Sequence, residues 1–159
     1  TAKEGSSRVI TQFLGHIVRG EPIKLVDGGT QKRAFTYIDD GIAALVKIID
    51  NPNGIASGKI YNIGNPANNW SVRELAERML AMAKTYPEYA ENAARVTLID
   101  TTAESYYGRG YQDVQNRVPK ITNTCADLDW KPIVGMEDAL ARILDAYRAQ
   151  VAEARRLVD

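Results

Sequence analysis

The sequence is poor in the residues that build disulfides and metal centres. Its 159 residues include one cysteine, Cys125, and one histidine, His16. A single thiol excludes a disulfide within the chain and is typical of a reducing compartment, so we expect a cytoplasmic protein. No cysteine or histidine cluster has the spacing of a zinc site, so we expect no bound metal.

A long hydrophobic run and an excess of charge are also missing. No apolar stretch approaches the roughly 20 residues of a membrane-spanning helix, and the first residues lack a signal-peptide core. Lysine and arginine total 20, as do aspartate and glutamate. This balance argues against bulk attraction to nucleic acid or to a membrane surface, so we expect neither as a partner. A bound anion must then be held by a local cluster of cations.

Two patterns of dinucleotide enzymes are absent as well. No Gly-x-x-Gly-x-x-Gly follows an expected strand, although the phosphate-cradling turn of a dinucleotide fold needs those glycines. No tyrosine is followed by a lysine four positions later. The chain also has no initiator methionine. We therefore expect no cofactor-binding residues here and a chain that begins within a longer protein.

What remains is a globular composition in which strands and helices alternate. Hydrophobic residues make up 45% of the chain and charged residues 25%, which suits a chain that buries a core. Apolar spacing predicts helices near 7–19, 39–50, 71–85 and from 137 onward. Strands are expected at 22–26, 34–38, 59–63 and 95–99. The alternation predicts an α/β or α+β class.

Several local signals refine this prediction. Ser71 and Glu74 have the spacing of a capping box, and Gly20 is expected to end the first helix. Asp39 or Asp40 is expected to cap the second helix. The apolar face of that helix should consist of Ile42, Leu45, Val46 and Ile49. Residues 85–94 read as a loop or a short helical excursion, and 100–130 as an irregular, functional stretch.

The first candidate site is the segment 24–33, in which a strand runs into a glycine pair and two cations follow. Glycines let a backbone approach a ligand closely, and Lys32 and Arg33 can pair with phosphate. The same pattern also suits a hairpin turn with solvated charges. The segment consists of Lys24, Leu25, Val26, Asp27, Gly28, Gly29, Thr30, Gln31, Lys32 and Arg33.

The second candidate site is the segment 104–117, which combines three tyrosines, two arginines and two glycines. Such a loop can close over a polar ligand, with tyrosine supplying ring and hydroxyl. An ordered surface loop whose tyrosines pack on the core is the alternative. Arg117 can pair with a carboxylate or phosphate, or form an ordinary exposed ion pair. It is a poor proton donor, because the pKa of arginine stays above about 12.

Several strings in the chain resemble extended short-chain dehydrogenase/reductases, the NAD-dependent epimerase/dehydratase family. They are Gly5-Ser6-Ser7-Arg8, 22–29, Gln31-Lys32-Arg33 with Phe35-Thr36, 60–66 and 128–132. Ser105-Tyr106-Tyr107-Gly108 with 110–114 is similar to the UDP-glucuronic acid decarboxylases of polymyxin resistance, which serve lipid A modification. Arg109 departs from that pattern, where lysine is expected. The likeness runs from Gly5 to about Tyr147.

The resemblance implies an α/β fold that is the C-terminal part of an extended short-chain dehydrogenase/reductase. Residues 1–159 would be mostly the small substrate-binding domain, and 34–63 would complete the Rossmann side. The N-terminal, NAD-binding half would be absent, so this chain alone would be inactive. The intact enzyme would be a homo-oligomer with NAD as its cofactor.

The resemblance also implies a reaction and roles for particular residues. NAD would oxidise C4 of UDP-glucuronate, and C6 would then leave as CO2 to give a UDP-4-keto-pentose. Residues 24–33 and Tyr111 would contact the UDP-sugar, with Arg33 on phosphate. Arg117 aligns with a proposed proton donor, although arginine suits stabilisation of the carboxylate or enolate better. The alternatives are half of another nucleotide-sugar epimerase or dehydratase, and a non-catalytic nucleotide-sugar-binding module.

Overall fold

The structure is a computed structural model that describes residues 8–107 and 114–156, with side chains up to Val151. The chain forms two compact units. The first unit contains 1–31, 71–114 and 140–159, and the second contains 32–70 and 115–139. Within the described residues, no helix has both the length and the apolar character needed to cross a membrane.

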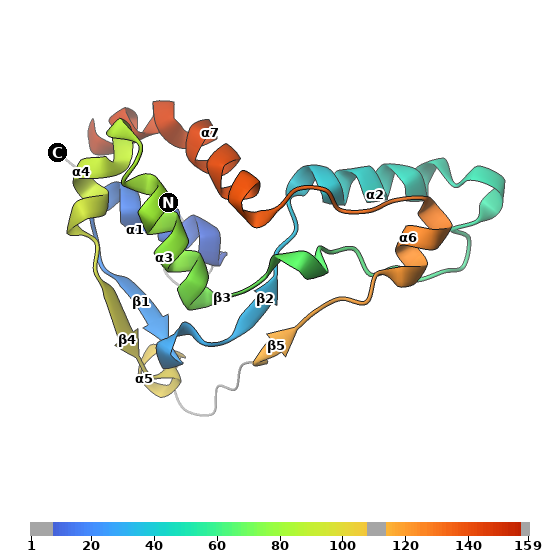
Figure 1. The fold of residues 1–159 in the computed structure, drawn as a ribbon, viewed down its shortest axis with the longest axis horizontal. Coiled ribbons are helices and arrows are strands. Elements are labelled where there is room, and N and C mark those ends of the chain that lie inside the picture. The colour runs from blue at the N-terminus through green and yellow to red at the C-terminus, as the bar shows by residue number, and fades with distance from the viewer. Residues whose placement is uncertain (1–7, 108–113, 157–159) are drawn as a thin grey trace. The chain divides into compact units, whose positions relative to one another are not determined.

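The first unit packs helices around two parallel strands. Strand β1 (Ile23–Val26) pairs with β4 (Leu98–Thr101), with Ile23 opposite Leu98 and Val26 opposite Thr101 (Figure 1). The other elements of this unit are α1 (Val9–Arg19), η1 (Asp27–Gly29), α3 (Val72–Ala83), α4 (Pro87–Arg95), α5 (Ala103–Tyr107) and most of α7 (Met136–Arg156). Parallel strands with intervening helices confirm the α/β class.

The helices of the first unit bury the apolar faces that the sequence predicts for them. Fully or almost fully buried are Phe13, Leu14 and Ile17 of α1, Leu75 and Met79 of α3, and Leu140 and Leu144 of α7. Helix α1 ends at Gly20 in the left-handed conformation, as predicted. Ser71 and Glu74 form the predicted capping box at the start of α3.

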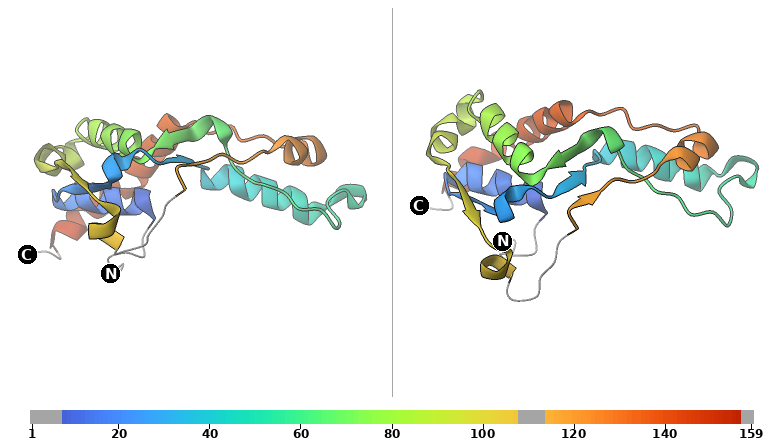
Figure 2. Two further views of the ribbon diagram at one scale, coloured as in Figure 1. Left: turned by 90° about the horizontal axis from the view of Figure 1, so that it is seen from below. Right: turned by 60° about the horizontal axis from the view of Figure 1, so that its bottom comes forward.

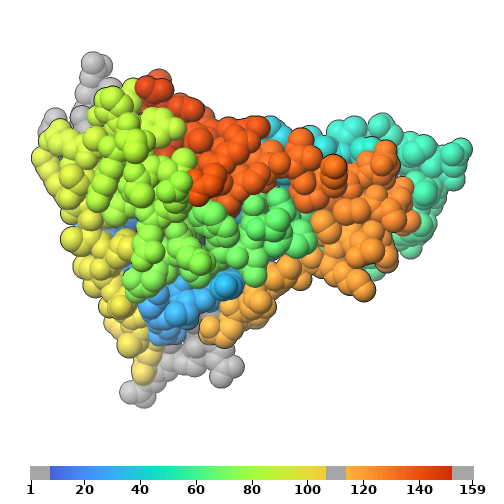
Figure 3. Space-filling view, viewed as in Figure 1, coloured from blue at the N-terminus to red at the C-terminus, as the bar shows by residue number. Residues whose placement is uncertain are grey.

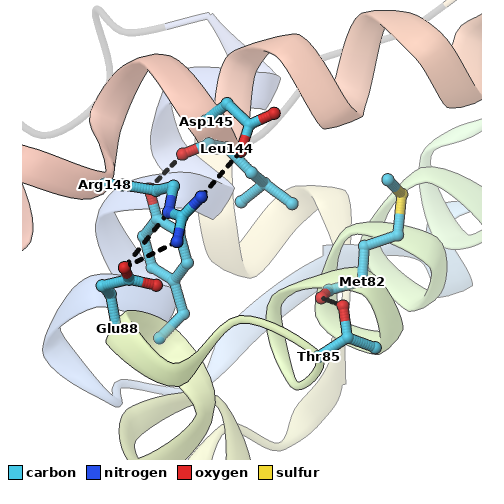
Figure 4. Close-up of polar contacts among 7 residues, drawn as sticks. Met82, Thr85, Glu88, Leu144, Asp145 and Arg148 are labelled. Atoms are coloured by element: carbon cyan, nitrogen blue, oxygen red, sulfur yellow. Dashed lines mark hydrogen bonds and ion pairs between the residues drawn. The ribbon is translucent and has the colours of Figure 1, made fainter.

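Charged and aromatic side chains fix α4 against α7 (Figure 4). Arg148 Nη2 lies 2.9 Å from Glu88 Oε1, and its guanidinium stacks over the Tyr86 ring. The hydrogen bond from Arg148 lowers the pKa of Glu88. Tyr89 Oη donates to the Leu144 carbonyl at 2.7 Å, and burial raises the pKa of Tyr89 to about 12. In Figure 3 the α3–α4 residues (light green) and α7 (red) share one surface.

The second unit combines a three-stranded sheet with two longer helices. The strands are β2 (Lys32–Ala34), β3 (Asn69–Ser71) and β5 (Asn116–Arg117), in the order β3-β2-β5. The helices are α2 (Ile38–Asp50) and α6 (Thr122–Leu128), with short turns η2 (Pro52–Gly54) and η3 (Pro66–Asn68). Ala44, Leu128 and Trp130 form the buried centre of this unit.

Asp40 holds α2 to the segment that follows α6. It is 4% exposed, and its carboxylate accepts the backbone N–H groups of Ile133 at 3.1 Å and Val134 at 3.0 Å. Trp130 Nε1 donates to the Asp40 carbonyl at 3.0 Å. The predicted capping role of Asp39 or Asp40 is wrong, because Tyr37 is the N-cap residue. The carboxylate of Asp40 instead satisfies donors that are distant in the sequence.

The apolar face predicted for α2 exists, and most of it is exposed. Ala44 is the apolar residue that α2 buries. The four residues of the predicted face, Ile42, Leu45, Val46 and Ile49, are all exposed, Ile49 by 79%. Helical spacing identifies an apolar face, but it does not say whether the same chain covers it.

Several predicted strands are shifted or absent. The strand expected at 34–38 is β2 (Lys32–Ala34), and the one expected at 95–99 is β4. Residues 59–63 form no strand within the described part of the chain, and Ile60 is 96% exposed. A strand needs a paired neighbour, which the sequence pattern alone cannot supply. Residues 85–94 contain α4, and the stretch 100–130 contains α5, β5 and α6.

Candidate functional site

One candidate site, in the first unit, lies where β1 and β4 end. Because the strands are parallel and Val26 is opposite Thr101, both strands end at the same edge of the sheet. Ligands of α/β proteins commonly bind beyond the carboxyl ends of parallel strands. Asp27 follows β1 directly, and its Oδ1 accepts the Ala103 N–H at 2.9 Å. This bond ties the candidate segment 24–33 to the start of α5.

A pocket of about 460 Å³ opens at this edge. Its lining consists of carboxylates, hydroxyls and backbone, which suits a ligand that donates hydrogen bonds. In Figure 3 the blue residues around β1 lie beside the yellow residues around β4. The lining residues are Asp27, Gly28, Asp100, Thr101, Thr102 and Ser105. They bring the first candidate segment together with the beginning of the second.

The turn after β1 is held by the start of α3. Gly29 has φ +67° and is buried, and a Cβ there would lie 3.0 Å from the Arg73 backbone nitrogen. Arg73 Nε donates to the Gly28 carbonyl at 2.8 Å, and its guanidinium also pairs with Asp100. Gly29 is therefore required by close packing as well as by backbone conformation.

A separate candidate site, in the second unit, is the parallel pair β2–β5. Lys32 is opposite Asn116 and Arg33 is opposite Arg117, and the Lys32 N–H donates to Gln115 O at 2.7 Å. The right view of Figure 2 shows the two strands side by side. Directly paired residues project from the same face of a sheet. Arg33 and Arg117, predicted from separate segments, are thus neighbours.

The predicted site residues differ in what they can offer a ligand. Leu25 and Val26 are buried in the core, so only their backbone atoms are available. Arg33 is half-buried, with Nη1 donating to Lys32 O at 2.7 Å, whereas Arg117 is exposed. Tyr111 lies outside the described residues. Side chains that reach the surface are those of Lys24, Asp27, Thr30, Gln31, Lys32, Arg33 and Arg117.

Arg73 and the pocket residues Asp100, Thr101 and Thr102 were not among the site residues predicted from the sequence. Asp100 directly follows the strand expected at 95–99, so the rule about carboxyl ends of parallel strands could have identified it. Arg73 stands in the first turn of a helix without any pattern that marks it as a site residue. Its role depends on the contact between α3 and the turn, which only the fold reveals.

The described residues offer no fitting site for a dinucleotide or a metal ion. Strand β1 leads through η1 into β2, whereas a dinucleotide pyrophosphate is held where a glycine turn opens a helix. Among these residues, no three His, Cys, Asp or Glu side chains gather in a way that could bind a metal.

Comparison with known proteins finds a solved structure that matches the whole chain and a family model that matches part of it. Over its full length it is 62% identical to PbgP3 from Burkholderia pseudomallei, with a TM-score of 0.82, and it covers 44% of that protein. Residues 1–64 match the NAD dependent epimerase/dehydratase family. This match supports the resemblance read from the sequence over these 64 residues.

Two further solved structures share the epimerase/dehydratase fold. UDP-glucose 4-epimerase from Thermotoga maritima, solved with UDP-glucose, has a TM-score of 0.61 at 21% identity, and the match covers 98% of this chain and 42% of that one. UDP-glucuronic acid 4-epimerase from Bacillus cereus, solved with NAD, has a TM-score of 0.58 at 22% identity, covering 84% and 35%. These confirm the predicted fold, and NAD is the family's cofactor. The chain spans less than half the length of each relative.

Proposed function

We propose that this chain is the UDP-sugar-binding part of an NAD-dependent UDP-glucuronate decarboxylase. The observation that carries the proposal is the pairing of Arg33 with Arg117 in β2–β5. It joins the segment that resembles a UDP-sugar-binding strand and turn with the end of the segment that resembles a decarboxylase loop. The 62% identity with PbgP3 over the whole chain adds support for a relative of that protein.

The substrate has negative charge at two places, the pyrophosphate and the C6 carboxylate. Arg33 and Arg117 supply two guanidinium groups from adjacent strands. Arginine pairs bidentately with phosphate and carboxylate alike. In the proposal, Arg33 binds a phosphate and Arg117 binds the carboxylate.

Decarboxylation follows oxidation at C4, for which the family's NAD is bound outside the described residues. With a ketone at C4, the C5–C6 bond breaks and CO2 leaves. The electron pair of that bond passes into an enolate across C4 and C5, which then takes a proton at C5. Arg117 stabilises the carboxylate and the enolate as a fixed positive charge. The proton comes from another group or water, because arginine does not release one near neutral pH.

The proposal includes a division of the polypeptide. Residues 34–63 would belong to the Rossmann side, which the exposed apolar face of α2 and the unpaired stretch 59–63 support. The NAD-binding part would lie in sequence outside this chain, so the chain alone would be inactive. A cytoplasmic homo-oligomer that acts in lipid A modification and polymyxin resistance completes the proposal.

The reaction is tested with the protein that contains this chain, UDP-glucuronate and NAD. Release of CO2 together with NADH supports the decarboxylase, whereas a changed sugar that keeps its C6 carboxylate supports an epimerase. Arg117→Met is expected to lower the rate of CO2 release about 100-fold or more, since a preorganised charge near a developing oxyanion contributes on that order. Its Kd for UDP should stay within a few-fold of the unmutated protein.

Lys120→Met is the matched control, because it removes an exposed cation three residues further along the same segment. We expect this variant to keep both CO2 release and UDP affinity. CO2 release by Arg117→Met at the unmutated rate would show that the role assigned to Arg117 is wrong.

A further inference from the structure

We infer that Arg73 is a positioning residue, which holds the turn 27–31 in the conformation that receives the UDP-sugar. The inference rests on the proposed function, because it assigns a task within the same site. Arg73 Nε donates to the Gly28 carbonyl at 2.8 Å. The same guanidinium pairs with Asp100, on the strand that borders the pocket. One side chain therefore bridges the two walls of the pocket.

The turn has an unusual backbone. Asp27, Gly28 and Gly29 have φ of +47°, +72° and +67°. Glycine adopts such φ values readily but aspartate does not, so surrounding contacts must fix Asp27 in particular. The Arg73 hydrogen bond reaches the middle of this run. The Asp27 carboxylate, which accepts the Ala103 N–H, fixes its first residue.

The start of α3 holds the far end of the turn as well. The Val72 N–H donates to the Gln31 carbonyl at 3.1 Å, and the Arg73 backbone packs against Gly29. The capping box beneath them fixes this helix end, with Ser71 N–H donating to Glu74 Oε2 at 2.7 Å. The chain of contacts thus runs from the helix cap through Arg73 to the turn. From there it reaches the pocket wall at Asp27 and Gly28.

The position of Arg73 defines what its loss should change. Its guanidinium is satisfied by protein groups, the Gly28 carbonyl, Asp100 and the more distant Glu77 at 3.8 Å. It is therefore not a catalytic residue. Losing a hydrogen bond to a charged group that orders a binding turn weakens ligand binding on the order of 10-fold. Ground state and transition state lose this binding equally, so KM rises while kcat is kept.

The test compares Arg73→Leu, Arg73→Lys and Glu77→Gln in the protein that contains this chain. KM and kcat are measured with UDP-glucuronate, the Kd with UDP by calorimetry, and Tm by thermal unfolding. We expect Arg73→Leu to raise KM and the UDP Kd about 10-fold, with kcat and Tm nearly unchanged. Glu77→Gln removes only the distant ion pair on the same helix, and it should match the unmutated protein.

Arg73→Lys decides the matter if Arg73→Leu does not fold. Lysine keeps a charge for Asp100 but cannot bridge two acceptors in the fixed geometry of a guanidinium, so KM should still rise. A KM and a UDP Kd within twofold of the unmutated values would overturn the inference. If the unmutated protein itself fails to bind UDP, the proposed function is what has failed, and the inference falls with it.

Discussion

At the scale of single residues, Gly29 has less space for a side chain than the neighbouring Gly28. Its φ is +67°, and a Cβ would lie 3.0 Å from the Arg73 backbone nitrogen. Gly28, one position earlier, has φ +72° but no atom nearer than 3.9 Å to a Cβ. Both glycines therefore have a positive φ, but the space available for a Cβ differs between them. Alanine at each position therefore separates conformational strain from steric overlap.

We predict that Gly29→Ala destabilises the protein more than Gly28→Ala does. A left-handed alanine costs about 1–2 kcal/mol at either position, and overlap with a helix backbone adds to that at Gly29. Urea unfolding followed by circular dichroism gives the difference between the two free energies of unfolding. Equal losses would mean that the turn moves away from α3 without cost.

The residues that the sequence could predict are those whose chemistry is unusual in a local pattern. Lys32 and Arg33 stood out because they follow a glycine pair, and Arg117 because it lies in a segment that combines tyrosines, arginines and glycines. The contacts that Arg73 and Asp40 make could not be predicted from the sequence. Each acts on groups more than 40 positions away in the sequence, and local patterns carry no information on such contacts.

Among the elements, α2 shows that a helical periodicity can be correct without determining which residues are buried. The helix forms where it was expected, over Ile38–Asp50, but most of its apolar face is exposed. Its attachment depends largely on Asp40, which accepts two backbone N–H groups from the segment after Trp130. Shifts of β2 and β4 by two or three residues have a related cause, since strand ends are set by the paired strand.

We predict that Asp40→Asn lowers the free energy of unfolding by about 1–3 kcal/mol. The amide replaces one accepting oxygen with a donor, which leaves a buried N–H group unpaired. Asp39→Asn, at the exposed neighbouring position in the same helical turn, should change it by less than about 0.5 kcal/mol. Chemical denaturation of both variants measures the contrast. Similar losses would indicate that charge at the helix start matters more than the two hydrogen bonds.

At the scale of the whole molecule, the chain spans 44% of the length of PbgP3, and the apolar face of α2 is exposed. The proposal that 34–63 belong to the Rossmann side implies that residues outside this chain cover the apolar face of α2. The sequence predicted the fold class and family, because those depend on strings spread along the chain. It could not predict which surfaces stay open, because burial depends on everything that packs against them.

We predict that Ile49→Glu has little effect on the stability of the 159-residue chain alone and destabilises the longer protein that contains it. In the 159-residue chain alone, Ile49 is already 79% exposed, so the free energy of unfolding should change by less than about 0.5 kcal/mol. In the protein that contains both parts, a buried unpaired carboxylate should cost several kcal/mol. Thermal unfolding of the four proteins measures this. An unchanged Tm in the longer protein would mean that its added part does not cover α2.

The division of the chain into units has a consequence for any attempt to separate them. The polypeptide passes from one unit to the other at 31–32, 70–71, 114–115 and 139–140. A protease that cuts at one of these crossings leaves three intact, so the two pieces stay tethered through the remaining covalent links. Neither unit can be expressed as one uninterrupted stretch. Exchange of either unit between relatives would therefore require several simultaneous splice points.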